Sequence, residues 1–415
     1  MTKLRPLLGA TIAPPNLTSA ELDVLAAVDH AVDTTIGPLA DEHDAAGRYP
    51  TRSIAALRST GVLALAVPAE LGGIGASHRA SLELQVRLGA ADSAVAQIVK
   101  VHDELVREIF VYCPPSMRES LARRIVDGRH MIGLAVAEAG KRVDDPWTTT
   151  IVPAGPDGAA SLNGRKVYTT GAAEADEIAV WAFDPTAPGI DTNPLLGFAL
   201  TLVPADTPGV TIHRDWDALG QRATDSGTIT FDAVACGPDL RASVAGLAPL
   251  PQSPVRYQAG FAAVLVGIGL GALRAAAPFV SGSSRPWPSA GVDSAGDDPL
   301  VRRLCGELTA DLVAAYHATM HTGDLLDAFE RGDIDRTSLA VPIYAAKAAA
   351  SRAAVRAASE VYALMGTRAT AKSNIFDRFW RNARTLSLHD PVDWKHEELG
   401  RHVLTGWDPE PGIYT

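Results

Sequence analysis

The segment RFWRNARTLSLHDPVDWK, residues 378–395, gathers side chains that could do acid–base chemistry near the end of the sequence. Its arginines recur at every third residue, and His389 and Asp390 follow just before Pro391. Arginines at this spacing are typical of one face of a helix. A histidine gives or takes a proton near neutral pH, and a carboxylate can act as a base. The segment is therefore either a solvated helix face ended by a proline or a site of proton transfer.

The elements that position this segment fall into three regions. Residues 18–130 show helical periodicity, beginning with the capping pattern Thr18-x-x-Glu21. The sequence RASLELQVRLGAADSAVAQIVKVHDELVREIF predicts two helices divided near residues 90–93. After Pro254 the chain is again helical, long and rich in alanine.

Between these helical regions the sequence pattern changes. Short runs that are rich in β-branched residues, or that alternate apolar and polar residues, are separated by Gly, Pro, Asn and Asp. This pattern predicts a β-domain. The runs are MIGLAVAE, TTTIVPAG, AASLNGRKVYTTG, EIAVWAFDP, LGFALTLVPA, GVTIHRDW and SGTITFDAV. We predict an α+β chain that is mainly α, with an N-terminal helical domain (1–130), a central β-domain (131–240) and a C-terminal helical bundle (241–415).

The composition bounds the kind of protein. Hydrophobic residues make up 47% of the sequence, charged residues 20%, and the net charge is −11. These values predict a soluble globular protein and argue against nucleic acid or an anionic membrane as the main partner. The three cysteines show no metal-ligand spacing and fit a reducing compartment, so we expect no metal site and a cytoplasmic location.

The apolar stretch at residues 258–280 allows two other interpretations, a membrane span and a nucleotide site. Arg274 interrupts it, and Ala and Gly dominate over Leu and Ile, so a helix buried within a bundle explains it better. It also contains Gly267-x-Gly269-x-x-Ala272, which matches a dinucleotide fingerprint superficially. That fingerprint requires a strand before it, whereas both flanks here are helical. We expect close helix packing instead.

The order of the three regions, with the motifs they carry, resembles the acyl-CoA dehydrogenase superfamily over essentially the whole chain. GVLALAVPAELGGIGAS is similar to its N-terminal turn, and LNGRKVYTTGAAEADEIAVWA and DWDALGQRATDSGTITFDAV are similar to its flavin-binding strands. DRFWRNARTLSLHDPVDWK and the ending GRHVLTGWDPEPGIY most resemble the reduced-flavin (group D) monooxygenases, which include dibenzothiophene monooxygenases and indole and phenol hydroxylases. The resemblance implies the superfamily fold, with a β-barrel-like central domain and a C-terminal four-helix bundle.

Dehydrogenases and monooxygenases of this superfamily need different residues. A dehydrogenase needs a carboxylate base, which the family supplies from the first long helix after the β-domain or from the loop after the arginine-rich helix. Here residues 257–280 contain no acidic residue, and the loop reads LSLHDP, with Asp390 as its carboxylate. A monooxygenase must instead keep a flavin C4a-hydroperoxide protonated, a task that suits a histidine. The sequence therefore favours the monooxygenase.

The resemblance implies roles for individual residues. His389 stands at the position of the catalytic histidine. Thr169 and Thr170 in VYTTG match the family's flavin-facing segment, and the Thr170 hydroxyl would bond near flavin N5. His102 in KVHDEL aligns with an active-site histidine, although a surface histidine beside Asp103 is an equal alternative.

The resemblance also implies how flavin is held. Trp216 would flank the flavin ring, and Thr224 and Ser226 would bind phosphate oxygens, although both are also ordinary turn residues. Arg285 and Arg368 match arginines that reach a flavin phosphate across a subunit boundary. We therefore expect a homo-oligomer, either a tetramer or a dimer.

The expected activity is that of a two-component monooxygenase acting on an apolar aromatic or heteroaromatic substrate. Reduced FMN or FAD would come from a separate reductase, and O2 would be the co-substrate. Leu134 and Leu386 replace an asparagine and a histidine of the dibenzothiophene enzymes, which makes the pocket more apolar. An acyl-CoA dehydrogenase using Asp390 and a flavin-binding protein without turnover stay open as alternatives. The substrate and the choice between FMN and FAD also stay open.

Overall fold

The computed structural model of the protein describes residues 17–140, 147–154, 159–237, 241–243 and 252–412. The N-terminal helices begin where the local sequence signals predict. Thr18 and Glu21 form the capping box: the Thr18 N–H donates to Glu21 Oε2 at 2.6 Å, and the Glu21 N–H donates to Thr18 Oγ1 at 3.3 Å. Asp92 divides the predicted helix pair and caps the second helix by accepting from the backbone of Ala94. The helices are α2 (Ser19–Ala31), α3 (Gly37–Ala46), α4 (Thr51–Arg58), α5 (His78–Ala91), α6 (Ser93–Tyr112) and α7 (Pro115–Val126).

Two limits of the N-terminal helices are determined by local backbone geometry. A π-helical turn, Val32–Ile36, interrupts the first helical segment and leads into α3. Pro38 lies in the first turn of α3 and has no N–H to donate to the turn before it, so a continuous α-helix would lose a hydrogen bond there. α4 ends at Arg58, and Gly61, whose φ is 81°, belongs to the following turn.

All seven predicted β-runs form strands, and the sequence pattern missed an eighth, β8, which pairs with β5. One path of neighbouring strands runs in the order β6-β7-β3-β2-β4-β5-β8, and β1 pairs in parallel with β4. The strands are β1 (Ile132–Ala135), β2 (Thr150–Pro153), β3 (Ala160–Lys166), β4 (Glu177–Phe183), β5 (Phe198–Pro204), β6 (Val210–His213), β7 (Thr228–Cys236) and β8 (Arg241–Ser243).

The C-terminal helices are α8 (Ser253–Gly282), α9 (Pro299–Glu330), α10 (Arg336–Met365), α11 (Asp377–Ser387) and α12 (Val392–Thr405). Every residue of α8 from Gln258 to Leu273 is buried. A Cβ atom on Gly267 would lie 2.6 Å from the Val86 carbonyl oxygen of α5, so a glycine is needed where these helices meet. The fingerprint-like glycines are therefore packing residues, as predicted.

α8 is the one helix of the described residues that is long and apolar enough to cross a membrane. Of its most apolar window, 67% is buried inside the protein. Its neighbours are α5, α9, α10 and α11. Since other helices cover it, α8 is the core helix of the bundle.

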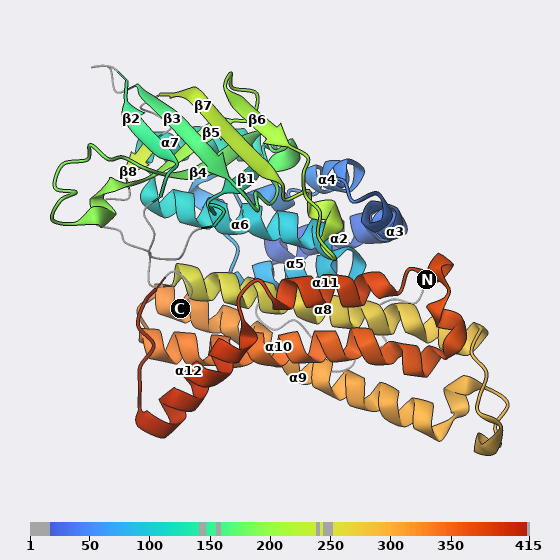
Figure 1. Ribbon diagram of the computed structural model, residues 1–415. Coiled ribbons are helices and arrows are strands. Elements are labelled where there is room, and N and C mark those ends of the chain that lie inside the picture. The colour runs from blue at the N-terminus through green and yellow to red at the C-terminus, as the bar shows by residue number, and fades with distance from the viewer. Residues whose placement is uncertain (1–16, 141–146, 155–158, 238–240, 244–251, 413–415) are drawn as a thin grey trace.

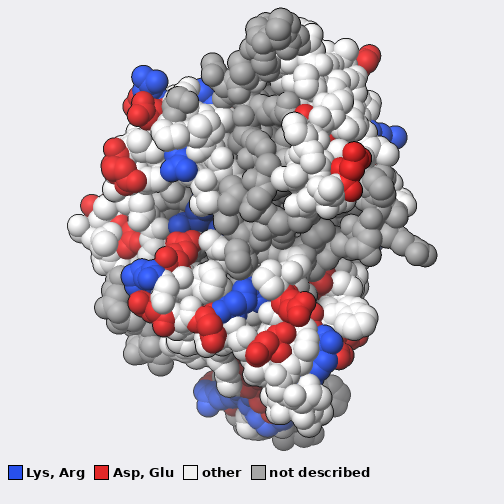
Figure 2. Space-filling view, turned by 90° about the vertical axis from the view of Figure 1, so that its left-hand side faces the viewer, with Lys and Arg blue, Asp and Glu red and all other residues white. Residues whose placement is uncertain are grey.

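Figure 1 shows the sheet at one end of the molecule and the long helices α8, α9 and α10 at the other. α5 and α6 form a layer between them, with α5 packed on α8 and α6 packed on β1. The mainly helical α+β architecture is as predicted. Figure 2 shows acidic and basic side chains interspersed on one face, and the residues described there form no extended basic patch.

Ion pairs fasten α11 to the N-terminal helix α3. Arg378 Nε lies 2.6 Å from Asp41 Oδ1, and Arg381 Nη2 lies 2.5 Å from Asp44 Oδ2. Arg384, the third arginine of the row, is exposed. The first two arginines therefore hold the end of the bundle through ion pairs and are not part of a solvated helix face.

The predicted role of Pro391 as the stop of α11 is wrong. α11 already ends at Ser387, and the Leu388 N–H turns back to bond the Thr385 carbonyl. Pro391 instead stands at the N-cap position of α12, where a missing N–H costs nothing. His389 therefore lies in a short turn between two helices.

Replacing Arg381 with leucine should lower the free energy of unfolding by roughly 2–4 kcal/mol, because it leaves the buried Asp44 carboxylate without its partner. Arg384→Leu, a change at an exposed position of the same helix, should stay within about 0.5 kcal/mol. Urea unfolding followed by circular dichroism measures both values. Equal losses in the two variants would contradict the assigned role of the Arg381–Asp44 pair.

Candidate active site

Gln221 joins all three parts of the chain through hydrogen bonds. Its backbone N–H donates to Asn382 Oδ1 of α11 at 2.6 Å, and its side-chain Nε2 donates to Ser93 Oγ of α6 at 3.1 Å. Its φ of 53° is left-handed, an uncommon conformation for a residue with a side chain. The loop between β6 and β7 is thereby held against both α6 and α11.

Three predicted flavin contacts, Thr170, Ser226 and Thr224, form a chain of buried hydroxyls that ends at the Gln221 carbonyl oxygen. Thr224 Oγ1 lies 2.8 Å from that oxygen, Ser226 Oγ lies 2.8 Å from Thr224 Oγ1, and Thr170 Oγ1 lies 2.8 Å from Ser226 Oγ. A carbonyl only accepts, and each hydroxyl has one proton, so every hydroxyl donates toward Gln221. Thr170 Oγ1 therefore donates its proton to Ser226 Oγ, and any further hydrogen bond to Thr170 Oγ1 must be one that it accepts.

Trp216 and Thr169 are held beside this chain. Trp216 Nε1 donates to the same Gln221 oxygen at 3.0 Å, and its ring meets the Tyr168 ring edge-on with 6.0 Å between centroids. Thr169 Oγ1 donates to the Gly227 oxygen at 2.8 Å. Tyr168 itself is 66% exposed and has a positive φ of 55°. An aromatic surface thus stands open next to the hydroxyl chain.

Two helices lead from Gln221 to one phenyl ring, that of Phe261 on α8. Ser93 and Lys100 are seven residues apart on α6, and Asn382 and His389 are seven residues apart at the end of α11. At 1.5 Å per residue, the α6 path covers about 10 Å, whereas the second path leaves α11 at Ser387 and ends in the turn that holds His389. Lys100 Nζ lies 3.7 Å from the centroid of the Phe261 ring, and the His389 ring centroid lies 4.1 Å from it.

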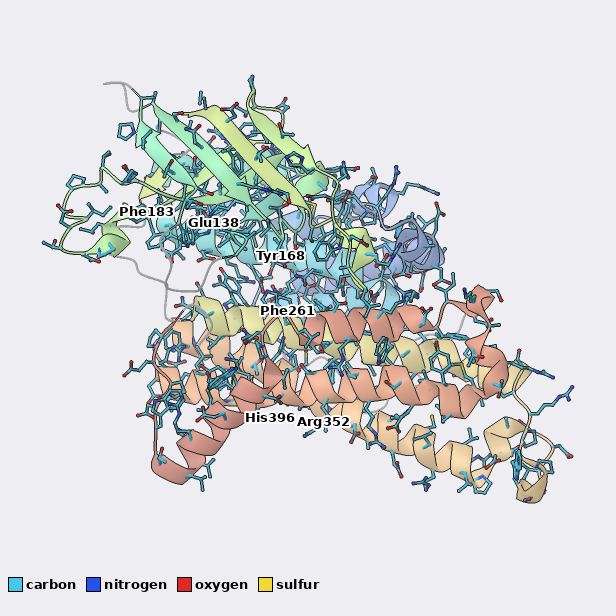
Figure 3. All side chains as sticks on the ribbon, in the orientation of Figure 1. Glu138, Tyr168, Phe183, Phe261, Arg352 and His396 are labelled. Carbon is cyan, nitrogen blue, oxygen red and sulfur yellow. The ribbon has the colours of Figure 1, made fainter. Side chains whose placement is uncertain are left out.

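The hydroxyl chain and His389 therefore flank the same stretch of α6. A Cβ atom on Gly171, next to Thr170, would lie 3.8 Å from Ile98 of that helix. Figure 3 shows Tyr168 at the end of the sheet nearest the bundle and Phe261 at the edge of the bundle below it. We take the candidate active site to be the region between the hydroxyl chain and Phe261.

His389 lies in the turn between α11 and α12. Its side chain is exposed to solvent, yet protein surrounds it closely enough to lower the pKa of the imidazole to about 3. Burial is the main cause, and the positive charges of Lys347 and Lys100 add to it. The expectation that this histidine titrates near the working pH is therefore wrong. It is a neutral imidazole at neutral pH, with one ring N–H and one ring acceptor.

The sequence pattern did not single out the lysines around this ring. Lys347 of α10 is fully buried, with Nζ 4.6 Å from the Phe261 centroid, and Nζ has no hydrogen-bond partner among the described residues. Burial, together with Lys100 and Lys395, lowers its pKa to about 7, and Asp390 partly offsets this effect. A lysine within the apolar run YAAKAAAS was the one visible signal.

His102 does not face the candidate site. Its Nδ1 accepts from the Ile132 backbone N–H at 3.0 Å, and its Nε2 lies 2.9 Å from the Leu63 carbonyl oxygen. The ring is 1% exposed, and burial lowers its pKa. Both nitrogens are engaged by backbone groups, so this geometry contradicts a catalytic role and assigns His102 to joining α6 with β1.

Asp390, the base required by the dehydrogenase alternative, is buried and paired with a lysine. Lys395 Nζ lies 3.5 Å from Asp390 Oδ2 and 3.0 Å from Glu398 Oε2. A carboxylate held as a counter-ion is poorly suited to remove a proton from carbon. Leu386 is buried, and Leu134 is half-buried with its N–H bonded to the Thr170 oxygen, so two apolar side chains border the site.

Arg285 and Arg368 lie on a different surface, where α8 and α10 end. Both are exposed, and Arg368 Nη1 donates to the Ser283 carbonyl oxygen at 3.0 Å. Nearby is a groove of about 730 Å³, which neither Thr170 nor His389 lines. Its walls come from α3, the loop after Trp216, the end of α10 and the start of α11, and include Asp44, Leu219, Arg222, Tyr362, Phe376 and Arg381.

Lys347→Met should raise the free energy of unfolding at pH 7 by roughly 3–5 kcal/mol, from the difference between pKa 10.5 and about 7. In the wild type, the unfolded chain binds more protons between these two values, so stability rises with pH from about 7 to 10.5. Urea unfolding at pH 7 and pH 9 should show this rise in the wild type and in the exposed-site control Lys372→Met, but not in Lys347→Met. The same pH dependence in all three proteins would contradict the charge assigned to Lys347.

The chain is similar to known proteins along most of its length. The N-terminal, middle and C-terminal domain profiles of acyl-CoA dehydrogenase match residues 18–129, 133–234 and 259–394. Dibenzothiophene monooxygenase of Mycolicibacterium goodii is 34% identical over 90% of this chain and 91% of its own length. The probable FMNH2-dependent monooxygenase SfnC of Pseudomonas putida is 31% identical over 90% and 93%.

Among solved structures, the dibenzothiophene monooxygenase TdsC of Paenibacillus sp. A11-2 superposes with a TM-score of 0.88. It is 31% identical, and the match covers 94% of this chain and all of TdsC. TdsC has been solved with FMN and with FMN and indole together. By these matches, and by the fold described above, the chain belongs to the acyl-CoA dehydrogenase family.

Proposed function

We propose that this protein is the oxygenase component of a two-component flavin-dependent monooxygenase. It takes reduced flavin from a separate reductase and uses O2 to oxygenate an aromatic or heteroaromatic substrate. The observation that carries the proposal is the neutral His389 imidazole against Phe261, at the position where a dehydrogenase would need a free carboxylate. The relatives named as monooxygenases support the same choice over a dehydrogenase.

The residues present fit a reduced flavin. Reduced flavin supplies the electrons that activate O2, and its central ring carries an N–H at N5 where oxidised flavin has a bare acceptor nitrogen. Thr170 Oγ1 is held as an acceptor by the hydroxyl chain, so it matches the reduced form and not the oxidised one. We assign Trp216 to the wall of the flavin pocket and Thr169 to orienting the loop through Gly227.

His389 is the residue that we assign to oxygen transfer. A neutral imidazole can donate its N–H to an oxygen atom reacting beside it and hold that proton in place. Phe261 stacks on His389, and Leu134 and Leu386 are further apolar side chains that we assign to the walls of the site. An aromatic ring such as indole, which TdsC binds, suits these walls.

We propose that the active enzyme is a homo-oligomer, a tetramer or a dimer, whose sites are shared between subunits. Arg285 and Arg368 are exposed together at one end of the bundle, and in the described part of the chain neither bonds to the hydroxyl chain. An exposed guanidinium there can still donate its remaining N–H groups to the flavin phosphate of a neighbouring subunit. The free thiols of Cys113, Cys236 and Cys305 suit a cytoplasmic location, which we also propose.

Mixing the protein with reduced FMN, oxygen and indole should give an oxygenated product with one atom from O2. His389→Gln should lower product formation by roughly 100-fold or more and release hydrogen peroxide instead. His396→Gln, an exposed histidine on the neighbouring helix α12, should behave as the wild type (Figure 3). Bleaching of bound FAD by an acyl-CoA, without oxygenation of any aromatic compound, would establish the dehydrogenase instead.

The hydroxyl chain should make the site prefer reduced over oxidised FMN. Ser226→Ala removes the group that accepts the Thr170 proton. The Thr170 hydroxyl can then donate to N5 of oxidised flavin instead. This hydrogen bond would stabilise only oxidised FMN, by about 1–2 kcal/mol. For a two-electron couple, that energy lowers the midpoint potential of bound FMN by roughly 20–40 mV in this variant. Spectroelectrochemical titration measures this shift, with Ser161→Ala as a hydroxyl control elsewhere in the β-domain. A potential that stays constant or rises in Ser226→Ala would refute the donor direction.

A further inference from the structure

The Phe261 ring is surrounded by nitrogen bases from three separate elements. Lys100 comes from α6, Lys347 from α10, and His389 from the turn between α11 and α12. We propose that this group, the Phe261 cluster, binds an oxyanion of the substrate, such as a carboxylate or sulfinate, through Lys347. The inference rests on the proposed function, because it names the chemical class of the molecule that the same site oxygenates.

Lys347 differs from the other buried lysines of the described residues. Lys100 Nζ bonds Glu104 at 2.8 Å, Lys166 Nζ bonds Glu138 at 3.0 Å, and Lys395 Nζ bonds Glu398 at 3.0 Å. Lys347 Nζ has no hydrogen-bond partner among the residues that the structure describes, although Lys347 is 0% exposed. A buried ammonium without hydrogen bonds is strongly unfavourable, so the position fits a partner that arrives with the ligand.

Within the described part of the chain, no group replaces that partner. Asp390 attracts Lys347, but its carboxylate is in contact with Lys395 at 3.5 Å. Lys100 is occupied by Glu104 and repels Lys347. The Phe261 ring attracts cations through its face, but it accepts none of the three hydrogen bonds that an ammonium group can donate. The missing partner is therefore an acceptor with negative charge.

The location suits a group attached to an aromatic substrate. His389 is reachable from solvent and stacks on the same ring that Lys347 approaches, with 35° between the two ring planes. A substrate held next to His389 for oxygen transfer would thus place its acidic group beside the ring that Lys347 also approaches, and Lys347, which is 0% exposed, must be uncovered for the two to pair. A neutral ligand would leave the Lys347 ammonium without a partner, so the cluster also discriminates between substrates.

The charges that face Lys347 determine the pH dependence. They are Lys100 on α6, His389 and Asp390 in the turn, and Lys395 on α12. Free Lys347 loses its proton near pH 7, and a bound anion favours the protonated form. Anion affinity should therefore be full below pH 7 and fall as the pH rises above it.

Equilibrium titration without oxygen or reduced flavin tests the inference, using matched acid and amide probes. Indole-2-carboxylate and benzoate differ from indole-2-carboxamide and benzamide mainly in charge. Calorimetry at pH 6.5 should show that at least one acid binds about 10-fold or more tightly than its amide. Its affinity should fall between pH 7 and pH 9.

Lys347→Met should lose this advantage by about 10-fold or more, keep the amide affinity, and show no pH dependence between 7 and 9. Its thermal unfolding midpoint should not fall, which shows that the variant is folded. Lys372→Met, at an exposed position, should match the wild type.

The inference is overturned if neither acid binds more tightly than its amide, or if Lys347→Met keeps the preference for the acid. Since no turnover is needed, these outcomes leave the proposed monooxygenase activity standing. If the wild type prefers the acid and Lys347→Met loses that preference, but the wild type oxygenates no aromatic compound, then the proposed function alone is refuted.

Discussion

The hydrogen bonds of Gln221 are the interaction on which the rest of the candidate site depends. A single residue in a left-handed conformation bonds α6 through its side chain, α11 through its N–H, and both Trp216 and Thr224 through its carbonyl oxygen. The β-domain loop, the N-terminal layer and the bundle are therefore all held in place by hydrogen bonds to this one residue. From it, α6 carries Lys100 to Phe261, and α11 with the turn that follows it carries His389 to the same ring.

The same carbonyl oxygen sets the polarity of the hydroxyl chain. Because it can only accept, the protons of Thr224, Ser226 and Thr170 all point one way, and the last oxygen is left as an acceptor. At the opposite end of the site, burial and two lysines keep His389 neutral. The site thus combines an acceptor at one side with an uncharged donor at the other, in walls that are mostly apolar. This combination suits oxygen transfer better than removal of a proton from carbon.

Much of the fold was predictable because its signals are local. The capping box at Thr18, the division of α5 from α6 at Asp92 and the seven β-runs all depend on neighbours in sequence. The small residues of α8 were correctly predicted to serve helix packing for the same reason. The π-helical turn before α3 and the early end of α11 were missed, since each depends on how one turn joins the next.

The candidate site was predictable only in part, because its chemistry arises from packing. The positions of His389 and the threonines could be inferred from resemblance, but the low pKa of His389 comes mainly from burial in the folded chain, and lysines on two other helices add to it. Lys347 and Phe261 come from distant segments that share no motif. His102 sits in a motif, yet its ring nitrogens turn out to bind backbone groups of Leu63 and Ile132.

The most direct test of the account is a crystal structure of the protein with FMN bound under reducing conditions. We expect the flavin ring between the hydroxyl chain and Phe261, with its N5 within hydrogen-bond distance of Thr170 Oγ1 and His389 on the side open to substrate. A flavin ring bound in the groove lined by Leu219 and Phe376, away from Thr170 and His389, would contradict it.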